Sequence, residues 1–325
     1  MTLPLNWRSR LMAHGFPGAT QVSCVHGAAV LRSYGDVPGA EAALRELLER
    51  YPEDEGALRA LIKLLQEEGR PEDTVPLRRR LHMRRCRELG IPPSRMDEAI
   101  AWLEAAETGA TLPERTDEAF VAALFDQYAA NFDQKLRGVL SYCAPERVRE
   151  VVRAALGERR ELDVLELGCG TGLAGVLLRP LARRLEGIDL SAGMLARARE
   201  RGVYDALREG EITRVLAESQ ERHALIVAVD VLVYFGALEE LFARVAARLE
   251  PGGVFAFSVE KGAEPGYRLQ QNGRYVHALS YLRECARAAG LTPVVEREAM
   301  LRTELAEPVI GHVVAVALPG DTADA

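Results

Sequence analysis

Cysteine is scarce and irregularly placed in this 325-residue chain. The sequence contains only Cys24, Cys86, Cys143, Cys169 and Cys285, and no two of them form a Cys-x-x-Cys pair. An odd, scattered set of this kind excludes a disulfide framework and a cysteine-based zinc site. Paired acids with metal-ligand spacing are also missing, so we predict no metal. We expect a reducing, cytoplasmic setting.

Long apolar runs are also lacking. The longest, from Ala224 to Leu238, is interrupted by Asp230 and is too short to span a membrane. It suits a buried strand followed by a loop. The first residues, MTLPLNWRSRLMAHGF, have no continuous apolar core followed by a small-residue cleavage site. The sequence therefore predicts no membrane partner.

The chain has no surplus of positive charge. Its formal net charge is −7, which argues against a nucleic-acid partner held by bulk electrostatics. Lysine occurs only at Lys63, Lys135 and Lys261, so arginine carries nearly all the positive charge, a bias that we attribute to the coding of the source genome. With 48% hydrophobic and 27% charged residues, the composition is that of a globular protein long enough for two domains.

Residues 1–90 predict an α-helical module. Apolar residues recur at helical spacing in stretches that begin near Ala40, Leu58 and Val75. Pro52 ends the first stretch and Gly69 ends the second.

A period of 34 residues runs through this module. It separates Gly35 from Gly69 and Leu31 from Leu65. The period and the segment GDVPGAEAALRELLERYPED resemble the helix–turn–helix unit of tetratricopeptide repeats. An ordinary helical bundle is the alternative, because about two repeats are marginal alone. If the repeats are present, they offer a surface for a protein partner.

Residues 91–117 predict a linker, rich in proline and turn residues, with a short amphipathic stretch around Trp102. From residue 118 to 325 the pattern changes to helices that alternate with short apolar strands. This alternation is typical of an α/β domain with a parallel sheet.

The chemistry-bearing stretch is a strand, a glycine-rich loop and a helix. Leu162–Leu167 predicts a strand that enters Gly168-Cys169-Gly170-Thr171-Gly172, and a helix follows. Glycine permits the sharp turn and lets a ligand lie on the backbone. The next strand ends in Asp189, 21 residues after Gly168, a spacing that suits contact with ribose hydroxyls.

A nicotinamide dinucleotide is the alternative ligand, because Gly170 to Gly175 also satisfies the pattern G-x-G-x-x-G. Glu166 disfavours it. A carboxylate at the end of the strand suits a cationic amine and would repel a pyrophosphate.

The segments ELGCGTG and GIDLSAGMLARARER resemble the first two motifs of class I S-adenosylmethionine-dependent methyltransferases. HALIVAVDVLVYFGALEELFARVAARLEPGGVFAFSVE resembles their later core, and FDQYAANFD resembles the helix that lies over the cofactor in many of these enzymes. The resemblance covers about residues 118–318 and implies a Rossmann-like, seven-stranded sheet. Repeats ahead of this domain match a bacterial group of predicted methyltransferases with tetratricopeptide repeats.

The resemblance also implies roles for individual residues. The loop of Gly168, Cys169, Gly170 and Gly172 would line the methionine part of S-adenosylmethionine, and Glu166 would face its ammonium through water. Asp189 would take the ribose hydroxyls. Further cofactor contacts would come from Leu190 and Met194 on the adenine, Glu211 near the adenine amine, and Asp230 and Val231 below the sulfonium.

A general base is needed only if the acceptor must lose a proton. The candidates are His277, Tyr128, Tyr234, Tyr275 and Tyr281, and for His277 a structural role is the alternative. Three functions stay open at this point. They are methyl transfer to a small molecule, methylation of a protein held by the repeats, and an interaction protein whose domain only binds the cofactor. The intact glycine loop and Asp189 speak against the third.

Overall fold

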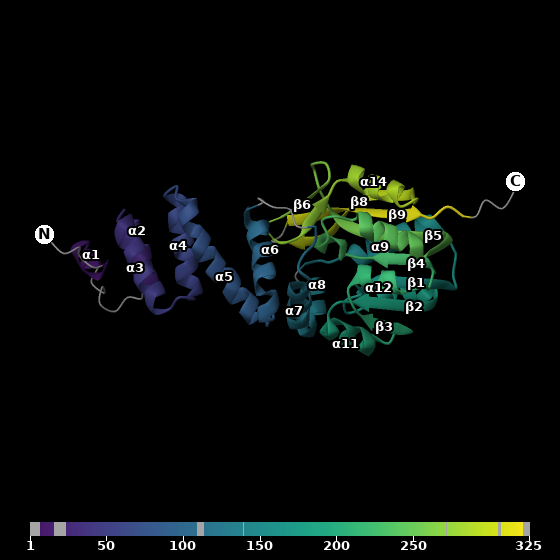
Figure 1. Ribbon diagram of the computed structural model, residues 1–325, viewed down its shortest axis with the longest axis horizontal. Coiled ribbons are helices and arrows are strands. Elements are labelled where there is room, and N and C mark those ends of the chain that lie inside the picture. Colours follow the sequence, from purple (N-terminus) through teal and green to yellow (C-terminus); the bar gives the residue numbers. More distant parts are fainter. Residues whose placement is uncertain are drawn as a thin grey trace. The chain divides into compact units, whose positions relative to one another are not determined.

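The computed structural model describes residues 7–15, 24–108, 114–138, 140–270, 272–304 and 307–320. Its internal contacts divide the chain into two compact units, Met1–Ile100 and Ala101–Ala325. Figure 1 labels many of the elements of both units. Each unit is described by itself.

The first unit is helical, as the sequence predicts. Pro52 and Gly69 lie just beyond the ends of α3 and α4, where helix-terminating residues are expected. The buried side chains between these helices are almost all leucine and alanine, for example Leu44, Leu58 and Leu61. The elements are α1 (Trp7–Ala13), α2 (Cys24–Ser33), α3 (Val37–Arg50), α4 (Glu55–Glu67), η1 (Pro71–Thr74), α5 (Val75–Glu88) and η2 (Pro93–Arg95).

Two turns of this unit have the same geometry 34 residues apart. Gly35 and Gly69 both adopt a left-handed backbone, with φ of 79° and 71°. After Gly35 the amide of Asp36 donates to the carbonyl of Leu31, and after Gly69 that of Arg70 donates to Leu65, each at 2.9 Å. These are helix C-caps of the Schellman type, in which glycine avoids the steric cost of the left-handed turn. Gly90, with a φ of 72°, ends α5 in the same way, since the Ile91 amide donates to the carbonyl of Cys86 at 2.9 Å. The 34-residue spacing thus joins two of several such helix ends, and the repeats stay a prediction.

Helix α6 (Met96–Thr108) occupies much of the predicted linker. Its Trp102 is buried, and its ring centroid lies 5.0 Å from that of Phe120 in α7. A side chain at Gly273 would come within 2.6 Å of the same indole. Trp102 is thus part of the core of the second unit, whereas its stretch was expected to be connector.

The second unit is an α/β fold around a mixed sheet. Its strands follow the order β3, β2, β1, β4, β5 across the sheet, which can be traced through the labels of Figure 1. These five are parallel, whereas β9 runs antiparallel to both β5 and β8. The strands are β1 (Leu162–Leu167), β2 (Ala182–Asp189), β3 (Ala206–Glu209), β4 (His223–Ala228), β5 (Leu249–Lys261), β6 (Tyr267–Leu269), β7 (Tyr275–His277), β8 (Thr292–Glu304) and β9 (Glu307–Ala317).

The expected number of strands was wrong: in the described residues the sheet has nine strands rather than seven. The difference is the short antiparallel pair β6–β7, which joins the sheet where β7 runs parallel to the end of β5 at Glu260 and Lys261. Its strands have three residues each, too few for a periodicity that sequence reasoning could detect. The pair brings Arg274, just before β7, towards the end of the sheet.

Helices cover both faces of the sheet. They are α7 (Glu118–Tyr128), η3 (Ala129–Asn131), α8 (Phe132–Gly138), α9 (Ala144–Leu156), α10 (Leu173–Leu178), η4 (Arg179–Leu181), α11 (Ala192–Arg201), α12 (Ile212–Glu218), η5 (Leu232–Tyr234), α13 (Glu239–Arg248) and α14 (Leu279–Ala288). Alternate residues of the strands point to opposite faces, so Phe255 and Phe257 join one cluster and Val254 and Ala256 the other.

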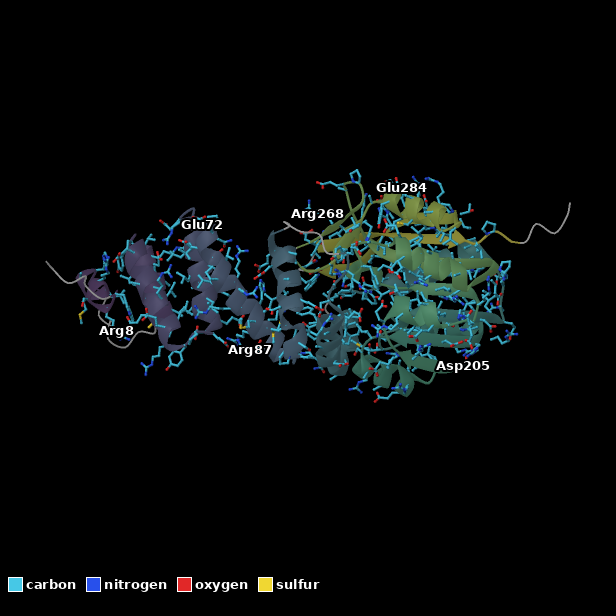
Figure 2. The ribbon with its side chains drawn as sticks, in the orientation of Figure 1. Arg8, Glu72, Arg87, Asp205, Arg268 and Glu284 are labelled. Atoms are coloured by element: carbon cyan, nitrogen blue, oxygen red, sulfur yellow. The ribbon has the colours of Figure 1, made fainter. Side chains whose placement is uncertain are left out.

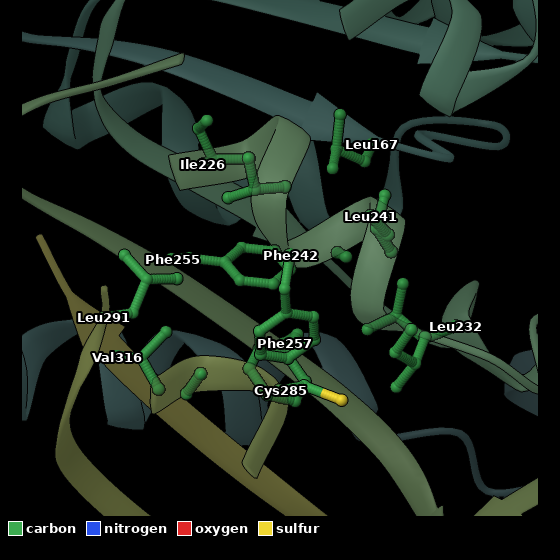
Figure 3. Packing of buried hydrophobic residues seen from close by; sticks show 14 of the residues in the cluster. Leu167, Ile226, Leu232, Leu241, Phe242, Phe255, Phe257, Cys285, Leu291 and Val316 are labelled. Carbon is green, nitrogen blue, oxygen red and sulfur yellow. The ribbon is translucent and has the colours of Figure 1, made fainter. Parts of the chain in front are cut away.

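The first cluster contains three packed phenylalanines, shown in Figure 3. The ring of Phe242 lies edge-on to Phe255 and Phe257, with centroids 5.5 and 5.3 Å apart. All three side chains are fully buried. Burying a phenylalanine contributes roughly 1.5–3 kcal/mol, so this cluster fixes α13 firmly on the sheet.

Charged side chains lie at the surface of both units, where Figure 2 labels Arg87 and Asp205. Arg87 pairs with Glu53 at 2.5 Å and Asp205 with Arg179 at 2.6 Å. In the ranges that the structure describes, no helix combines the length and apolarity needed to cross a bilayer.

Candidate functional site

A cavity of about 420 Å³ opens at the carboxyl ends of the parallel strands. Loops that follow β1, β2, β3 and β4 form its floor, and α7 and α8 contribute its wall. The strand order reverses direction between β1 and β4, and ligands bind at such switch points in open α/β sheets. The lining brings together Tyr128, Glu166, Gly168, Cys169, Gly170, Asp189, Leu190, Met194, Glu211, Asp230, Val231 and Tyr234 from the residues singled out in the sequence.

The three glycines of the loop after β1 differ in what a side chain at each position would contact. Gly168, Gly170 and Gly172 all have left-handed φ angles, of 65°, 55° and 87°. A Cβ on Gly168 would lie 2.4 Å from Val231, and one on Gly172 would lie 2.9 Å from Tyr204. A Cβ on Gly170 would meet no protein atom within 4 Å. Gly168 and Gly170 line the cavity, whereas Gly172 is not among the lining residues and packs against Tyr204. Of the three, only Gly170 has a Cβ position that no protein atom approaches within 4 Å.

Tyr204 also explains the pattern that resembled a dinucleotide motif. A Cβ on Gly175 would lie 2.2 Å from the Tyr204 hydroxyl oxygen. Gly175 is thus required by packing against this phenol inside the protein. The third glycine of G-x-G-x-x-G gives no support to a pyrophosphate ligand here.

Asp189 anchors the glycine loop. Its Oδ2 accepts a 2.7 Å hydrogen bond from the Gly170 amide, and its Oδ1 accepts one of 2.9 Å from the Ser191 amide. Burial raises the pKa of this carboxyl, while the amides of Ser191 and Gly170 oppose the shift. The loop and the carboxylate therefore hold one another in place at the end of β2.

Glu166 lies buried at the end of β1, with 2% of its surface exposed. The Tyr204 hydroxyl donates a 2.8 Å hydrogen bond to its Oε2. Burial, with a smaller contribution from the nearby Asp189, raises the pKa of Glu166 to about 8, although the hydrogen bond from Tyr204 opposes the shift. A cation bound in the cavity would stabilise the ionised form of this carboxyl.

Glu211 differs from its expected role. It caps the N-terminus of α12, where Oε1 accepts from the Thr213 amide at 2.9 Å and Oε2 accepts from the Arg214 amide at 2.8 Å. The Thr213 hydroxyl also donates to Oε2, at 2.5 Å. Oε1 accepts one of these bonds and Oε2 two, so Glu211 is a buried helix cap that also lines the cavity. Its contact with an adenine amine stays a prediction.

Two acids of the leading segment fasten it over the cavity. Asp126 accepts from the Ser191 hydroxyl at 2.5 Å and from the Gly193 amide at 2.9 Å. Asp133 accepts from the Thr171 hydroxyl at 2.5 Å and pairs with Arg201. Sequence reasoning recognised this segment as FDQYAANFD but assigned neither acid, although both lie inside the motif.

The far end of the cavity is polar and was not predicted as a group. Asp230 follows β4 with a left-handed φ of 56°, unusual for a non-glycine residue, and pairs with Arg274. Arg302 from β8 also lines this end, and so does Tyr142. No local motif marks the two arginines, because they come from segments that follow Asp230 by 44 and 72 positions and only the fold brings them together.

His277 and Tyr275 do not line the cavity, and their interpretation as catalytic candidates is corrected. Both are fully buried in β7. Nε2 of His277 donates to the carbonyl oxygen of Gly236 at 3.1 Å, and burial lowers the pKa of this histidine to about 4. Tyr281 is likewise internal: its hydroxyl accepts from the Leu238 amide at 2.9 Å and donates to Glu239 at 2.9 Å.

Comparison with known proteins agrees with this architecture. Residues 136–296 match a family model described as a methyltransferase domain. This region is a class I S-adenosylmethionine-dependent methyltransferase domain. S-adenosylmethionine is the cofactor of the family.

Curated relatives match parts of the methyltransferase domain. Trans-aconitate 2-methyltransferase of Paracidovorax citrulli is 37% identical over 108 residues, which is 32% of this chain and 42% of the relative. Malonyl-[acyl-carrier protein] O-methyltransferase of Pectobacterium atrosepticum is 30% identical over 154 residues, covering 45% of this chain and 55% of the relative. The chain thus spans about half the length of the curated relatives it matches.

A solved structure shares the fold. The 1,6-didemethyltoxoflavin-N1-methyltransferase of Burkholderia thailandensis, solved with 1,6-didemethyltoxoflavin and S-adenosylhomocysteine, superimposes with a TM-score of 0.50 and 20% identity. The match covers 65% of this chain and 93% of that one.

Proposed function

We propose that this protein transfers the methyl group of S-adenosylmethionine to a small-molecule acceptor, at oxygen, nitrogen or carbon, by in-line displacement. The observation that carries the proposal is the free space above Gly170, in a cavity that is also lined by the half-buried carboxyl of Asp189 and the buried carboxyl of Glu166. This space would be filled by any side chain, and its rim offers acceptors for ribose hydroxyls and for an ammonium group.

The residues of the cavity fit this cofactor. Asp189, already oriented by two amides, would accept from the ribose hydroxyls, and Glu166 would face the ammonium. Leu190 and Met194 would contact the adenine, and the loop with Cys169 would carry the methionine part. Asp230 and Val231 would lie below the sulfonium, beside Gly168. Glu211, held by its cap at the start of α12, would lie near the adenine amine.

When bound, S-adenosylmethionine supplies an electrophilic methyl group on a sulfonium, and its leaving group departs neutral. The chain then has to align the acceptor and exclude water. Apolar and aromatic side chains such as Val121, Phe125 and Phe132 wall the cavity, and Phe125 packs edge-on against Tyr234 at 5.5 Å. Tyr128 and Tyr234 lie where they could contact an acceptor.

One relative and the cavity bear on the size of the methyl acceptor. Trans-aconitate 2-methyltransferase is named for a small-molecule acceptor, and the cavity here has a volume of about 420 Å³, with α7 and α8 contributing its wall. Both observations support a small acceptor over a protein substrate.

The helical unit is a second part of the proposal. The matching caps at Gly35 and Gly69 support tetratricopeptide-like repeats, and such repeats would offer a surface to a protein partner. The division into a helical module (1–90), a linker (91–117) and a catalytic domain (118–325) stays a prediction, with α6 placed inside the linker.

The test is incubation of the purified protein with methyl-labelled S-adenosylmethionine and lysate of the source organism, followed by separation into protein and small-molecule fractions. The proposal predicts enzyme-dependent label in the small-molecule fraction. Label confined to protein would favour protein methylation, and label in neither fraction would favour a cofactor-binding interaction protein. A matched control is Gly170→Arg, which fills the free space.

A further inference from the structure

The cavity lining includes a half-buried guanidinium, that of Arg274, in which each of the three nitrogens donates a hydrogen bond to the protein. Arg274 donates from Nε to Glu260 at 2.5 Å, from Nη1 to the Tyr234 hydroxyl at 3.0 Å, and from Nη2 to Asp230. Its side chain is 15% exposed. Arg274 therefore shapes this part of the cavity through its neighbours.

Arg302, beside it, is not fully engaged. Its side chain is 5% exposed, and Nη2 donates to Glu260 at 2.8 Å and to Glu304 at 2.9 Å. Nη1 is buried and has no hydrogen-bond partner among the described residues, and Asp230 Oδ1 lies 3.7 Å away. Asp230 therefore pairs with this nitrogen in charge but lies too far away to accept a hydrogen bond, and a buried donor left without one is costly. Arg302 also lines the cavity. This geometry calls for a ligand that brings its own acceptor oxygen.

A general base is also missing in this part of the cavity. Histidine does not occur among the described residues that line the cavity. Burial raises the pKa values of Tyr142 and Tyr234, and the nearby Asp230 raises both further. Asp230 itself is held by Arg274. An alcohol or phenol acceptor, which must lose its proton, therefore finds no side chain here suited to take it.

We infer that the methyl acceptor is a small carboxylic acid, bound as its carboxylate by Nη1 of Arg302, and that the product is a methyl ester. This inference rests on the function proposed above and names its substrate class. A carboxylate satisfies the orphan donor, since guanidinium and carboxylate match in charge and shape. It is also already deprotonated at neutral pH, so it needs no base.

The chemistry is balanced without any proton transfer. A lone pair on one carboxylate oxygen forms the new bond to the methyl carbon while the carbon–sulfur bond breaks. The electron pair of that bond goes to sulfur, which becomes the neutral thioether of S-adenosylhomocysteine. Arg302 positions the acceptor and gives up part of its ion pair as the ester forms.

The first experiment uses the wild-type protein and the labelled small-molecule fraction. Methyl esters hydrolyse in mild alkali and release labelled methanol, which is volatile, whereas N-methyl, C-methyl and ether products keep their label. The inference predicts that most of the transferred label becomes volatile after alkali. Transferred label that survives alkali would overturn it and leave the proposed methyl transfer standing.

The second experiment measures binding and does not depend on turnover. Phenylacetate and phenylacetamide have the same shape and differ in charge, and calorimetry compares their affinities for the protein with and without S-adenosylhomocysteine. We expect phenylacetate to bind at least about 10-fold more tightly, as a hydrogen bond to a buried charge implies. Equal affinities would contradict the inference even if no label is transferred in the first experiment.

Variants assign the preference to one residue. Arg302→Met should remove the preference for phenylacetate while S-adenosylhomocysteine affinity is retained. Arg268→Met, a matched change at an exposed arginine of β6, should leave the preference intact. Arg302→Lys should restore part of it. A preference that survives in Arg302→Met overturns the assignment, and if that variant does not fold, the alkali test on the wild-type product decides.

Discussion

The hydroxyl of Tyr204 donates a 2.8 Å hydrogen bond to the buried carboxyl of Glu166 at the end of β1. The same phenol packs against Gly172 and Gly175, so one side chain supports both the glycine loop and the carboxyl beside it. Tyr204 has no counterpart in the motifs read from the sequence, and its role follows from the fold alone.

The raised pKa of Glu166 predicts a pH-dependent stability. In the folded protein this pKa is about 8, against an ordinary value of 4.5, because burial disfavours the charged carboxylate. Between about pH 4.5 and pH 8 the carboxyl of Glu166 is therefore protonated in the folded state and ionised in the unfolded state. The stability contributed by this group is complete below about pH 4.5 and is lost as the pH rises through about 8. Between these two values the free energy of unfolding falls by roughly 1.4 kcal/mol for each step of one in pH.

Urea unfolding of the cofactor-free protein at a series of pH values between 5 and 8.5 measures this effect. Glu166→Gln should unfold with a flatter pH dependence than the wild type. Tyr204→Phe should raise the pH at which this stability is lost, because the hydrogen bond from Tyr204 lowers the pKa of Glu166. Identical profiles for wild type and Glu166→Gln would show that the carboxyl is not protonated in the folded state.

Two glycines of one loop should respond differently to substitution. Gly168→Ala places a methyl group 2.4 Å from Val231, so it should lower the melting temperature clearly. Gly170→Arg meets no protein atom near its Cβ and should cost on the order of 1 kcal/mol for its left-handed backbone. It should nevertheless abolish cofactor binding. Thermal melting and calorimetry of both variants separate these effects, and an unstable Gly170→Arg that still binds cofactor would contradict the assignment.

His277→Gln should leave methyl transfer within about 3-fold of the wild type and lower stability by about 1–3 kcal/mol, the range expected for a lost buried hydrogen bond. In the wild-type protein the pKa of His277 is about 4, below the ordinary 6.5. The contribution of this histidine to stability is therefore complete above about pH 6.5 and is lost as the pH falls through about 4. The pH–rate profile should show no midpoint near 6.5. A 100-fold loss of turnover with unchanged stability would return His277 to the catalytic machinery.

The position of Trp102 predicts where the catalytic unit can be separated. A fragment beginning at Pro92 keeps α6 and the contact of Trp102 with Phe120, and it should fold and bind S-adenosylhomocysteine. A fragment beginning at Thr116 lacks this buried indole, whose removal costs about 3–5 kcal/mol, and it should melt at a lower temperature. Circular dichroism melts of the two fragments decide the matter. Equal melting temperatures would mean that α6 is only a connector.

Local sequence predicts most of the residues that line the cavity on the side proposed for the cofactor. Strand, glycine loop, helix and Asp189 lie within thirty residues, roughly the length of one βαβ unit, and their chemistry depends on spacing along the chain. The acceptor side depends on long-range pairing. Arg302 reaches the cavity because β8 pairs with β9 and β9 with β5, and Arg274 because β7 pairs with the end of β5.

His277 also shows that long-range strand pairing limits what the sequence can predict. Its position just before a helix is visible in the sequence, but the face to which a residue of a three-residue strand points is set by the strand it pairs with. That pairing turns the ring towards Gly236 and the core. The β6–β7 pair is therefore the element that places His277 in the core, away from the acceptor site proposed here.

The central claim is that the cavity around Gly170 holds S-adenosylmethionine, and calorimetric titration with S-adenosylhomocysteine tests it most directly. The account predicts one site per chain with micromolar affinity, about −8 kcal/mol, which Asp189→Ala weakens and Gly170→Arg abolishes. The matched control is NAD, which should not bind. Tight binding of NAD together with no detectable heat from S-adenosylhomocysteine would contradict the account.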